Sequence, residues 1–297
     1  MTPPRFSLVI PTCDRPEALA LCLGKLGAAE QRVAADFFEI IVTDDGRTRQ
    51  ASEVLAGRFP GVRWTMGPRR GPAANRNHGA SLAGGDVLVF LDDDCLPEPG
   101  LLAEYARFLA LDGEGAEVGA IEGRIAAERP RRRLDEEAPV NETGGLFWSC
   151  NVAVRTEVFR RVRGFDERFP HAAMEDVELR ERLRRNGVKI VFLRDALVVH
   201  PLRRLAGWPS LRRRAMAHGI YMQMETRHFT PWGYLEACRR FLRSWRQILT
   251  DARKFGLRGL GLRAQYSLFS FLCVREMKKT KHLPRLPSWD RVGGRQS

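Results

Sequence analysis

The stretch that decides the fold is GGDVLVFLDDDCLPEPG, residues 84–100. Its five consecutive apolar residues, 87–91, are typical of a short strand that is buried on both faces. Three carboxylates, Asp92, Asp93 and Asp94, follow this strand directly. Because neighbouring carboxylates repel one another, we expect a cationic partner where the strand ends.

The first half of the chain alternates similar apolar runs with helical patterns. Strands are predicted for four of these runs: 6–11, 38–46, 62–67 and 87–91. Buried strands that alternate with helices indicate an α/β fold whose mostly parallel central sheet is flanked by helices. In such sheets, ligands bind beyond the carboxyl ends of the strands. We therefore expect residues 12–15, 44–45 and 92–94 to line one crevice.

The pattern continues less regularly up to about residue 204. A further strand is predicted at 118–126, followed by a charged, proline-containing mobile loop. Another strand then leads into a short helix capped near Thr156. The run 175–185 is predicted to be a helix that Asn186-Gly187 ends. Two last strands, KIVFL and LVVHP, are expected to close the sheet.

The composition is that of a soluble globular protein. Of 297 residues, 44% are hydrophobic and 29% charged, and no apolar run approaches the ~20 residues that span a bilayer. The N-terminal apolar run is too short for a signal peptide, so we expect a cytoplasmic protein. The six cysteines include no CxxC pair, which predicts reduced thiols rather than disulfides or a zinc site.

Basic charge is concentrated in the C-terminal third. Residues 201–297 hold 21 Lys+Arg and 5 Asp+Glu, a formal charge of +16, within a chain whose total is +13. Residues 232–255 place apolar side chains at helical spacing, with arginines between them. Three interpretations stay open. The helix can pack on the rest of the protein, or bind an anionic membrane surface on the cytoplasmic face. It can also bind nucleic acid, for which the sequence contains no recognition module.

Carboxylates at the mouth of a strand suit a hard divalent cation. Mg²⁺ and Mn²⁺ prefer oxygen ligands and are often held by one or two carboxylates together with substrate phosphates. The alternative is that each aspartate caps a following helix or lies in a solvated turn. That alternative explains less well why three acids face a second acidic strand end at 44–45. The sequence therefore predicts a Mn²⁺ or Mg²⁺ site.

Five stretches resemble successive motifs of glycosyltransferase family 2: VIPTCDRPEAL, IIVTDDG, GPAANRNHGASLAGGDVLVFLDDDC, GFDERF and MEDVELRERLRRNGVKIVFL. The resemblance covers about residues 5–201 and implies an inverting, nucleotide-sugar-dependent enzyme with the Rossmann-like GT-A fold. It implies a catalytic domain at 1–204, with a nucleotide-sugar half at about 1–97 and an acceptor half at about 98–204. A basic helical region at 205–297 is expected to follow it.

The resemblance also implies roles for individual residues. Those expected to bind the nucleotide-sugar are Pro11, Thr12, Asp14, Arg15, Asp44, Asp45, Arg76, Asp92 and Asp93. The expected metal ligands are Asp94, Asp92 and His200. Cys13 departs from the family, in which an aromatic residue is common here. A surface position for Arg76 and a structural role for His200 remain alternatives.

An acidic pair, Glu175 and Asp176, matches the family motif at a helix start, which implies that Asp176 is the general base. An aspartate there can also serve simply as a helix cap. Glu178 is a weaker candidate for the base, because its spacing from Arg182 predicts an i,i+4 pair on the surface.

The acceptor is expected to lie against Trp148 and Asn151, in a loop that also contains Gly144 and Gly145. The resulting hypothesis is metal-dependent transfer of a sugar from a nucleotide-sugar, UDP by family habit, to a hydroxyl of a saccharide or lipid-linked acceptor. A sugar nucleotidyltransferase is one alternative, but PTCDRPE lacks the glycine-rich phosphate loop that it needs. A catalytically degenerate relative that binds nucleotide-sugar or glycan is the other, and the presence of both acidic motifs argues against it.

Overall fold

The computed structural model describes residues 4–55, 57–110, 117–225 and 232–279. Backbone contacts divide the chain into two compact units. Unit 1 comprises residues 1–129, 138–170 and 175–202, and unit 2 comprises 130–137, 171–174 and 203–297. Residues 130–137 thus group with the C-terminal helices, although they precede the last part of unit 1 in the sequence.

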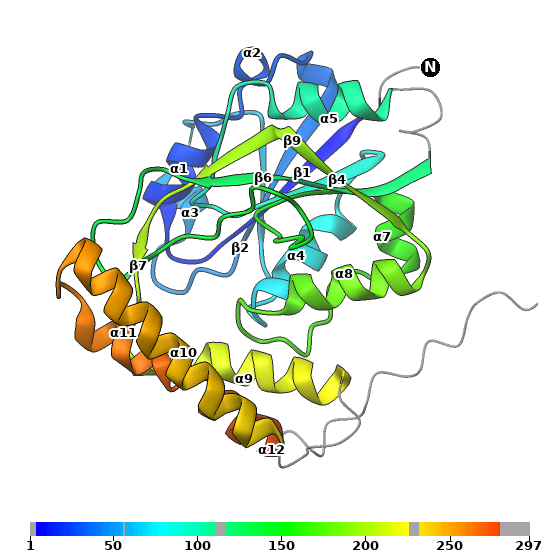
Figure 1. The fold of residues 1–297 in the computed structure, drawn as a ribbon. Helices are drawn as coiled ribbons and strands as arrows, with labels where there is room; N and C mark the ends of the chain where they lie inside the picture. Colours follow the sequence, from blue (N-terminus) through cyan, green and yellow to red (C-terminus); the bar gives the residue numbers. More distant parts are fainter. Residues whose placement is uncertain (1–3, 56, 111–116, 226–231, 280–297) are drawn as a thin grey trace, which may run out of the picture. The chain divides into compact units, whose positions relative to one another are not determined.

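Unit 1 is built on one eight-stranded sheet with the order β3-β2-β1-β4-β8-β6-β9-β5 (Figure 1). Its strands are β1 Phe6–Thr12, β2 Phe38–Asp44, β3 Val62–Met66, β4 Val87–Leu91, β5 Leu96–Pro97, β6 Val118–Ala127, β8 Asn151–Arg155 and β9 Lys189–His200. Strands β1 to β4 run parallel, as do β6 and β9, whereas β8 lies antiparallel between β4 and β6. The predicted α/β fold with a mostly parallel sheet is confirmed.

Helices cover both faces of this sheet. The helices of unit 1 are α1 Pro16–Leu23, α2 Ala28–Gln31, α3 Ala51–Val54, α4 Pro72–Ser81, α5 Leu101–Leu109, α7 Thr156–Arg161 and α8 Glu175–Arg185, with a 3₁₀ turn, η1, at Ala35–Phe37. Leu8 and Ile10 of β1 pack into a core with α1 and α5, whereas Val9 packs with α4, α7 and α8. Burial on both faces explains why the strand sequences are continuously apolar.

Two local predictions are wrong. Thr156 does not cap α7: Arg155 holds the cap position, and the Thr156 hydroxyl donates to the Gly85 carbonyl at 2.7 Å, which ties the helix start to the sheet. Glu178 and Arg182 do form an i,i+4 pair, but they bury it, with side chains 3% and 6% exposed.

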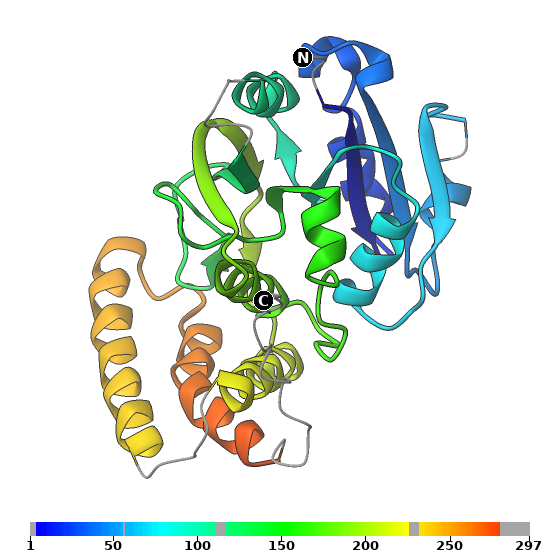
Figure 2. The same ribbon diagram turned by 90° about the vertical axis from the view of Figure 1, so that its right-hand side faces the viewer.

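Unit 2 contains four helices within its described residues: α9 Trp208–Glu225, α10 Trp232–Phe255, α11 Leu260–Ser267 and α12 Phe269–Lys279. Helix α12 lies between α9 and α10 (Figure 2). The segment expected to be a mobile loop forms a short strand, β7 Glu136–Glu137, that pairs with β10 Arg203–Arg204. None of the described helices combines the length with the apolar content that crossing a membrane requires.

Candidate active site

Asp93, the middle carboxylate after β4, is fully buried. The Thr12 hydroxyl at the end of β1 donates to it at 2.7 Å, and the Arg15 guanidinium lies 2.5 Å from its other oxygen. Burial raises the pKa of Asp93 to about 7, although Arg15 acts in the opposite direction. The expected cation at the end of the strand is therefore, in part, an arginine from the β1–α1 connection.

Asp92 is held by a second arginine. Arg76 on α4 lies 2.6 Å from Asp92 and 3.0 Å from Glu175 at the start of α8, and only 3% of its side chain is exposed. Burial acts to raise the pKa of Asp92, but Arg76 outweighs it and keeps that pKa below its usual value. The alternative of a surface position for Arg76 is wrong. Its guanidinium instead joins the acids of β4 to those of α8.

Asp94 faces the histidine at the end of β9. The His200 Nε2 atom lies 3.4 Å from an Asp94 carboxylate oxygen, and its Nδ1 atom lies 2.9 Å from the Pro201 carbonyl. Because a carbonyl can only accept, this contact requires a proton on Nδ1, so Nε2 is the ring nitrogen that a metal ion could use. A carboxylate oxygen beside an imidazole nitrogen is a donor set that could hold a divalent metal ion.

Cys95 lies beside this pair, with ligand atoms of Asp94, Cys95 and His200 within 4.8 Å of one another. Burial raises the pKa of the Cys95 thiol well above its ordinary value, and the thiol donates to the Cys150 carbonyl at 3.6 Å. The protonated thiol is a poor ligand, because metals bind the thiolate. The carboxylate and imidazole are therefore the donors that fit a hard cation.

Asp176 lies in the first turn of α8. One of its oxygens accepts the Val177 N–H at 2.8 Å, and the other accepts the Ser149 N–H at 3.4 Å. Part of its side chain stays exposed, while protein atoms crowd the rest. Burial, with the neighbouring Glu175 charge, raises the pKa of Asp176 to about 7. A carboxylate with a pKa near the working pH is suited to accept a proton from a substrate.

The acids near the ends of β1 and β2 organise loops. One oxygen of Asp14 accepts the backbone N–H groups of residues 47–49, and these bonds, Thr48 first, lower its pKa to about 2. Asp44 accepts the N–H of Gly46 at 2.7 Å and of Ala51 at 2.6 Å. These hydrogen bonds fix the conformation of the loop that follows β2, so both carboxylates have protein partners.

Two further residues, Asp45 and Pro11, were expected to bind the nucleotide-sugar. Asp45 accepts the Arg69 N–H at 2.7 Å, and burial raises the pKa of its carboxyl. Pro11 is buried inside β1. A role for either in nucleotide binding stays a prediction.

The two expected acceptor residues have different surroundings. Trp148 is partly buried against the core. Asn151 is fully buried, and its amide is saturated by protein groups: its oxygen accepts the hydroxyl of Tyr105 on α5 at 2.7 Å, and its nitrogen donates to the carbonyls of Arg124 and Ala196 in the neighbouring strands. Asn151 therefore stabilises the packing of β6, β8 and β9, and the expectation that it faces an acceptor is wrong.

Glu122, inside β6, is a residue that the sequence analysis missed. Its carboxylate accepts the backbone N–H groups of Gly145, Leu146 and Phe147, the last at 2.7 Å, and the Asn141 amide at 3.0 Å. It thereby fixes the loop that leads to the Ser149 N–H at Asp176. An acid inside the apolar run VGAIEGRIA was the signal, because a carboxylate is buried only where donors surround it.

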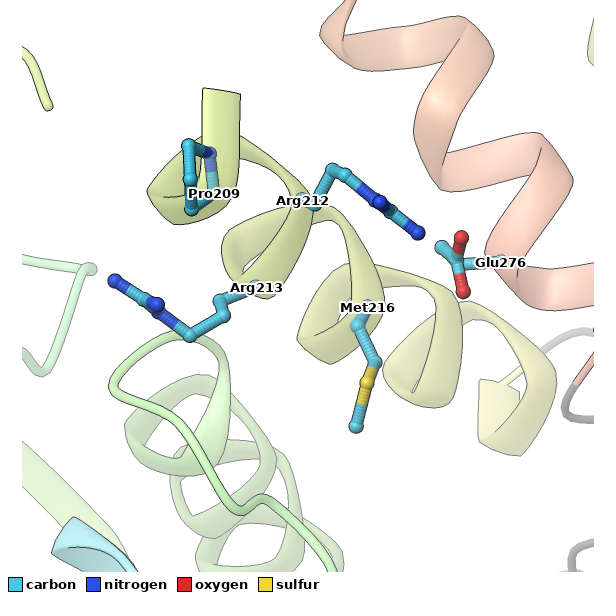
Figure 3. A pocket seen from close by; sticks show the side chains of 5 residues that line it. All are labelled: Pro209, Arg212, Arg213, Met216 and Glu276. Atoms are coloured by element: carbon cyan, nitrogen blue, oxygen red, sulfur yellow. The ribbon is translucent and has the colours of Figure 1, made fainter. Parts of the chain in front are cut away.

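A pocket of about 300 Å³ lies within unit 2, lined by Pro209, Arg212, Arg213, Met216 and Glu276 (Figure 3). Arg212 points toward Glu276, whereas Arg213 points the other way. The two guanidinium groups do not converge on one point, so the pocket lacks the geometry that binds a single anion. None of the residues predicted for catalysis lines it.

Comparisons with known proteins identify the family to which the chain belongs. A family model described as glycosyl transferase family 2 matches residues 7–169. The chain belongs to glycosyl transferase family 2. The resemblance stated from the motifs is therefore confirmed.

Among curated proteins, a validoxylamine A glucosyltransferase of Streptomyces hygroscopicus subsp. jinggangensis is 30% identical over 237 residues, with 65% of this chain and 54% of that protein covered. The chain thus spans about half the length of that relative. Among solved structures, a mannosyltransferase from Pyrobaculum calidifontis in complex with GDP-Man and Mn²⁺ has a TM-score of 0.60 at 17% identity, covering 95% of this chain and 88% of that one.

A second solved structure, S. aureus TarS 1-349 in complex with UDP-GlcNAc, has a TM-score of 0.55 at 15% identity and covers 93% of this chain and 90% of that one. At these identities the likeness concerns the fold. The GT-A fold predicted from the motifs is confirmed.

Proposed function

We propose that this chain is an inverting, metal-dependent glycosyltransferase that moves a sugar from a nucleoside diphosphate sugar to a hydroxyl of a saccharide or lipid-linked acceptor. The observation that carries the proposal is the junction made by Arg76. It joins Asp92, beside the Asp94–His200 donor pair, to Glu175, beside Asp176. One buried guanidinium thus links the two carboxylates that are sequence neighbours of the proposed metal ligand Asp94 and the proposed base Asp176.

In the proposed reaction, Asp176 accepts the proton of the acceptor hydroxyl as its oxygen attacks the anomeric carbon. The bond from that carbon to the diphosphate oxygen breaks, and the nucleoside diphosphate leaves from the opposite face, so that the configuration inverts. Proton transfer of this kind contributes roughly 10²–10⁴-fold to the rate. The Ser149 N–H donates to the Asp176 carboxylate at 3.4 Å and restricts its orientation.

Asp94 and His200 would hold the divalent cation, with Asp92 beside them. A bound Mn²⁺ or Mg²⁺ supplies Lewis-acid stabilisation of charge on the departing diphosphate. The chain's own contribution is to keep His200 in the tautomer that presents Nε2 and to keep Asp92 ionised through Arg76. Arg15 pairs with Asp93 and Asp94, and its side chain is 45% exposed, which supports the proposal that it contacts the diphosphate.

We propose UDP as the nucleotide. Because the two structural neighbours are complexes with GDP-Man and with UDP-GlcNAc, GDP is the nucleotide to compare with UDP. Calorimetry of UDP and GDP with Mn²⁺, and again with EDTA, tests the donor site. We expect Mn²⁺-dependent binding of UDP that Asp94→Asn abolishes and that Asp36→Asn, an exposed acid elsewhere in unit 1, leaves unchanged. Binding that ignores both the metal and Asp94 would overturn the proposed donor site.

Transfer itself distinguishes the enzyme from a degenerate binding protein. With the donor that binds and a panel of saccharide and lipid-linked acceptors, Asp176→Asn should lower turnover by roughly 10²–10⁴-fold while UDP binding is retained. Full activity of this variant would exclude Asp176 as the base. A nucleotidyltransferase is disfavoured, because β1 is followed by Cys13–Arg15 and then directly by α1, with no glycine-rich phosphate loop.

A further inference from the structure

Helix α10 has two apolar faces, and the described residues of the chain cover only one of them. Ala237 and Ile248 are 2% and 1% exposed, and the Phe241 ring lies 5.9 Å from that of Phe271 on α12. This is the face that packs inside unit 2. It accounts for part of the apolar residues whose helical spacing the sequence shows.

The other face exposes large apolar side chains. Leu235 is 43% exposed, and Leu242 and Leu249 are each 61% exposed. Cys238 is exposed and Trp245 partly exposed between them. The five residues alternate steps of three and four along the helix, so they form one line, here called the outer stripe, about 21 Å long at 1.5 Å per residue.

Arginines border the outer stripe along one side. Each of its leucines is followed four residues later, one turn along the helix, by an exposed arginine: Arg239, Arg246 and Arg253. Within the part of the chain that the structure describes, none of these arginines has a carboxylate within 4.0 Å. Both acids of α10 are used elsewhere, Glu236 by Arg240 at 2.9 Å and Asp251 by Arg131 at 3.0 Å.

We propose that the outer stripe of α10 docks on the surface of an anionic lipid bilayer. Helices that lie in the interface place leucine and tryptophan among the acyl chains and basic residues at the headgroups, and the outer stripe with its arginine border has this arrangement. A second copy of the chain is the less suitable occupant. It would bring a second row of arginines against the first, with no free acid on α10 to pair with either. The surface is independent of the proposed transferase reaction.

Sedimentation of the full-length protein with lipid vesicles tests this inference. We expect binding to vesicles that contain phosphatidylglycerol, loss of most binding on pure phosphatidylcholine, and weakening with added salt. Leu242→Gln with Leu249→Gln should reduce the affinity at least about tenfold. Leu21→Gln, at a leucine of α1 that is 66% exposed, is the matched control and should leave the affinity unchanged.

Charge is tested separately. Arg246→Gln should weaken binding about fivefold, since one basic residue contributes ~1 kcal/mol near an anionic surface. Arg160→Gln, an exposed arginine of α7, removes the same charge elsewhere and should have little effect. Absence of binding to phosphatidylglycerol vesicles would overturn the proposal, as would a vesicle-free dimer that the leucine variant dissociates. UDP binding in solution is the parallel readout, and it should be unchanged in every variant of α10.

Discussion

Replacing the Asp176 carboxylate by an amide should stabilise the protein at neutral and alkaline pH. Crowding by protein atoms, with the Glu175 charge beside it, raises the pKa of Asp176 from an ordinary 3.8 to about 7. As the pH rises between these values, the unfolded chain loses this proton before the folded chain does. The free energy of unfolding therefore falls across this range, and the cost persists above it.

The two pKa values differ by about 3, which at 1.36 kcal/mol per pH unit limits the loss of unfolding free energy to about 4 kcal/mol. The amide of Asp176→Asn carries no charge and can still accept the Val177 N–H. We expect the free energy of unfolding of the variant to exceed that of the wild type by about 2–4 kcal/mol at pH 8, and by less than about 1 kcal/mol near pH 4. Urea unfolding at a series of pH values measures this difference.

Asp14→Asn is the control of opposite sign. Backbone donors, Thr48 first, lower the pKa of Asp14 to about 2. Its carboxylate therefore stabilises the fold above its ordinary pKa, and the amide variant should be less stable there. If Asp176→Asn is less stable than the wild type at pH 8, or if the difference does not vary with pH, the surroundings of Asp176 do not oppose its ionisation and the reasoning fails.

Three further predictions concern buried polar groups. Arg182→Leu should lower the free energy of unfolding by about 3–5 kcal/mol, because it leaves the Glu178 carboxylate unpaired. Adding Glu178→Met to this variant should recover most of the loss. If urea melts show that the losses of the two single variants add up in the double variant, this explanation is contradicted. Tyr105→Phe should cost about 1–3 kcal/mol, because the buried Asn151 oxygen loses its donor; an unchanged melting midpoint would show that another group replaces it. Glu122→Gln should raise the acceptor KM and leave UDP affinity unchanged, since its carboxylate fixes the loop before Ser149; equal effects on donor and acceptor would indicate general unfolding instead.

Secondary-structure elements, which depend on short stretches of the chain, were predicted well from the sequence. The strands at Phe6–Thr12, Phe38–Asp44 and Val87–Leu91 follow from continuous apolar runs, and helix α8 from its spacing and the Asn186-Gly187 stop. Because parallel strands end at one edge, residues 12–15, 44–45 and 92–94 were expected to meet there. Thr12 and Arg15 do contact Asp93, which lies 81 and 78 positions further along the chain.

Pairings between distant segments were decided only by the tertiary structure. Nothing near Arg76 in the sequence indicates that it is buried between Asp92 and Glu175, the latter 99 residues away. Asn151 fits an acceptor loop by sequence, yet Tyr105 of α5 and two sheet carbonyls occupy its whole amide.

Helix α10 also shows the difference between what the sequence predicts and what the tertiary structure decides. Helical spacing alone established an amphipathic helix, because spacing depends on backbone geometry within a few turns. Which apolar residues are covered depends on where the neighbouring helices α11 and α12 pack, and in the structure Ile248 is buried whereas Leu242 and Leu249 are exposed. Local sterics thus determine the elements of this protein, whereas burial and charge pairing, which determine its candidate site and its outer stripe, arise only when segments far apart in the chain come together.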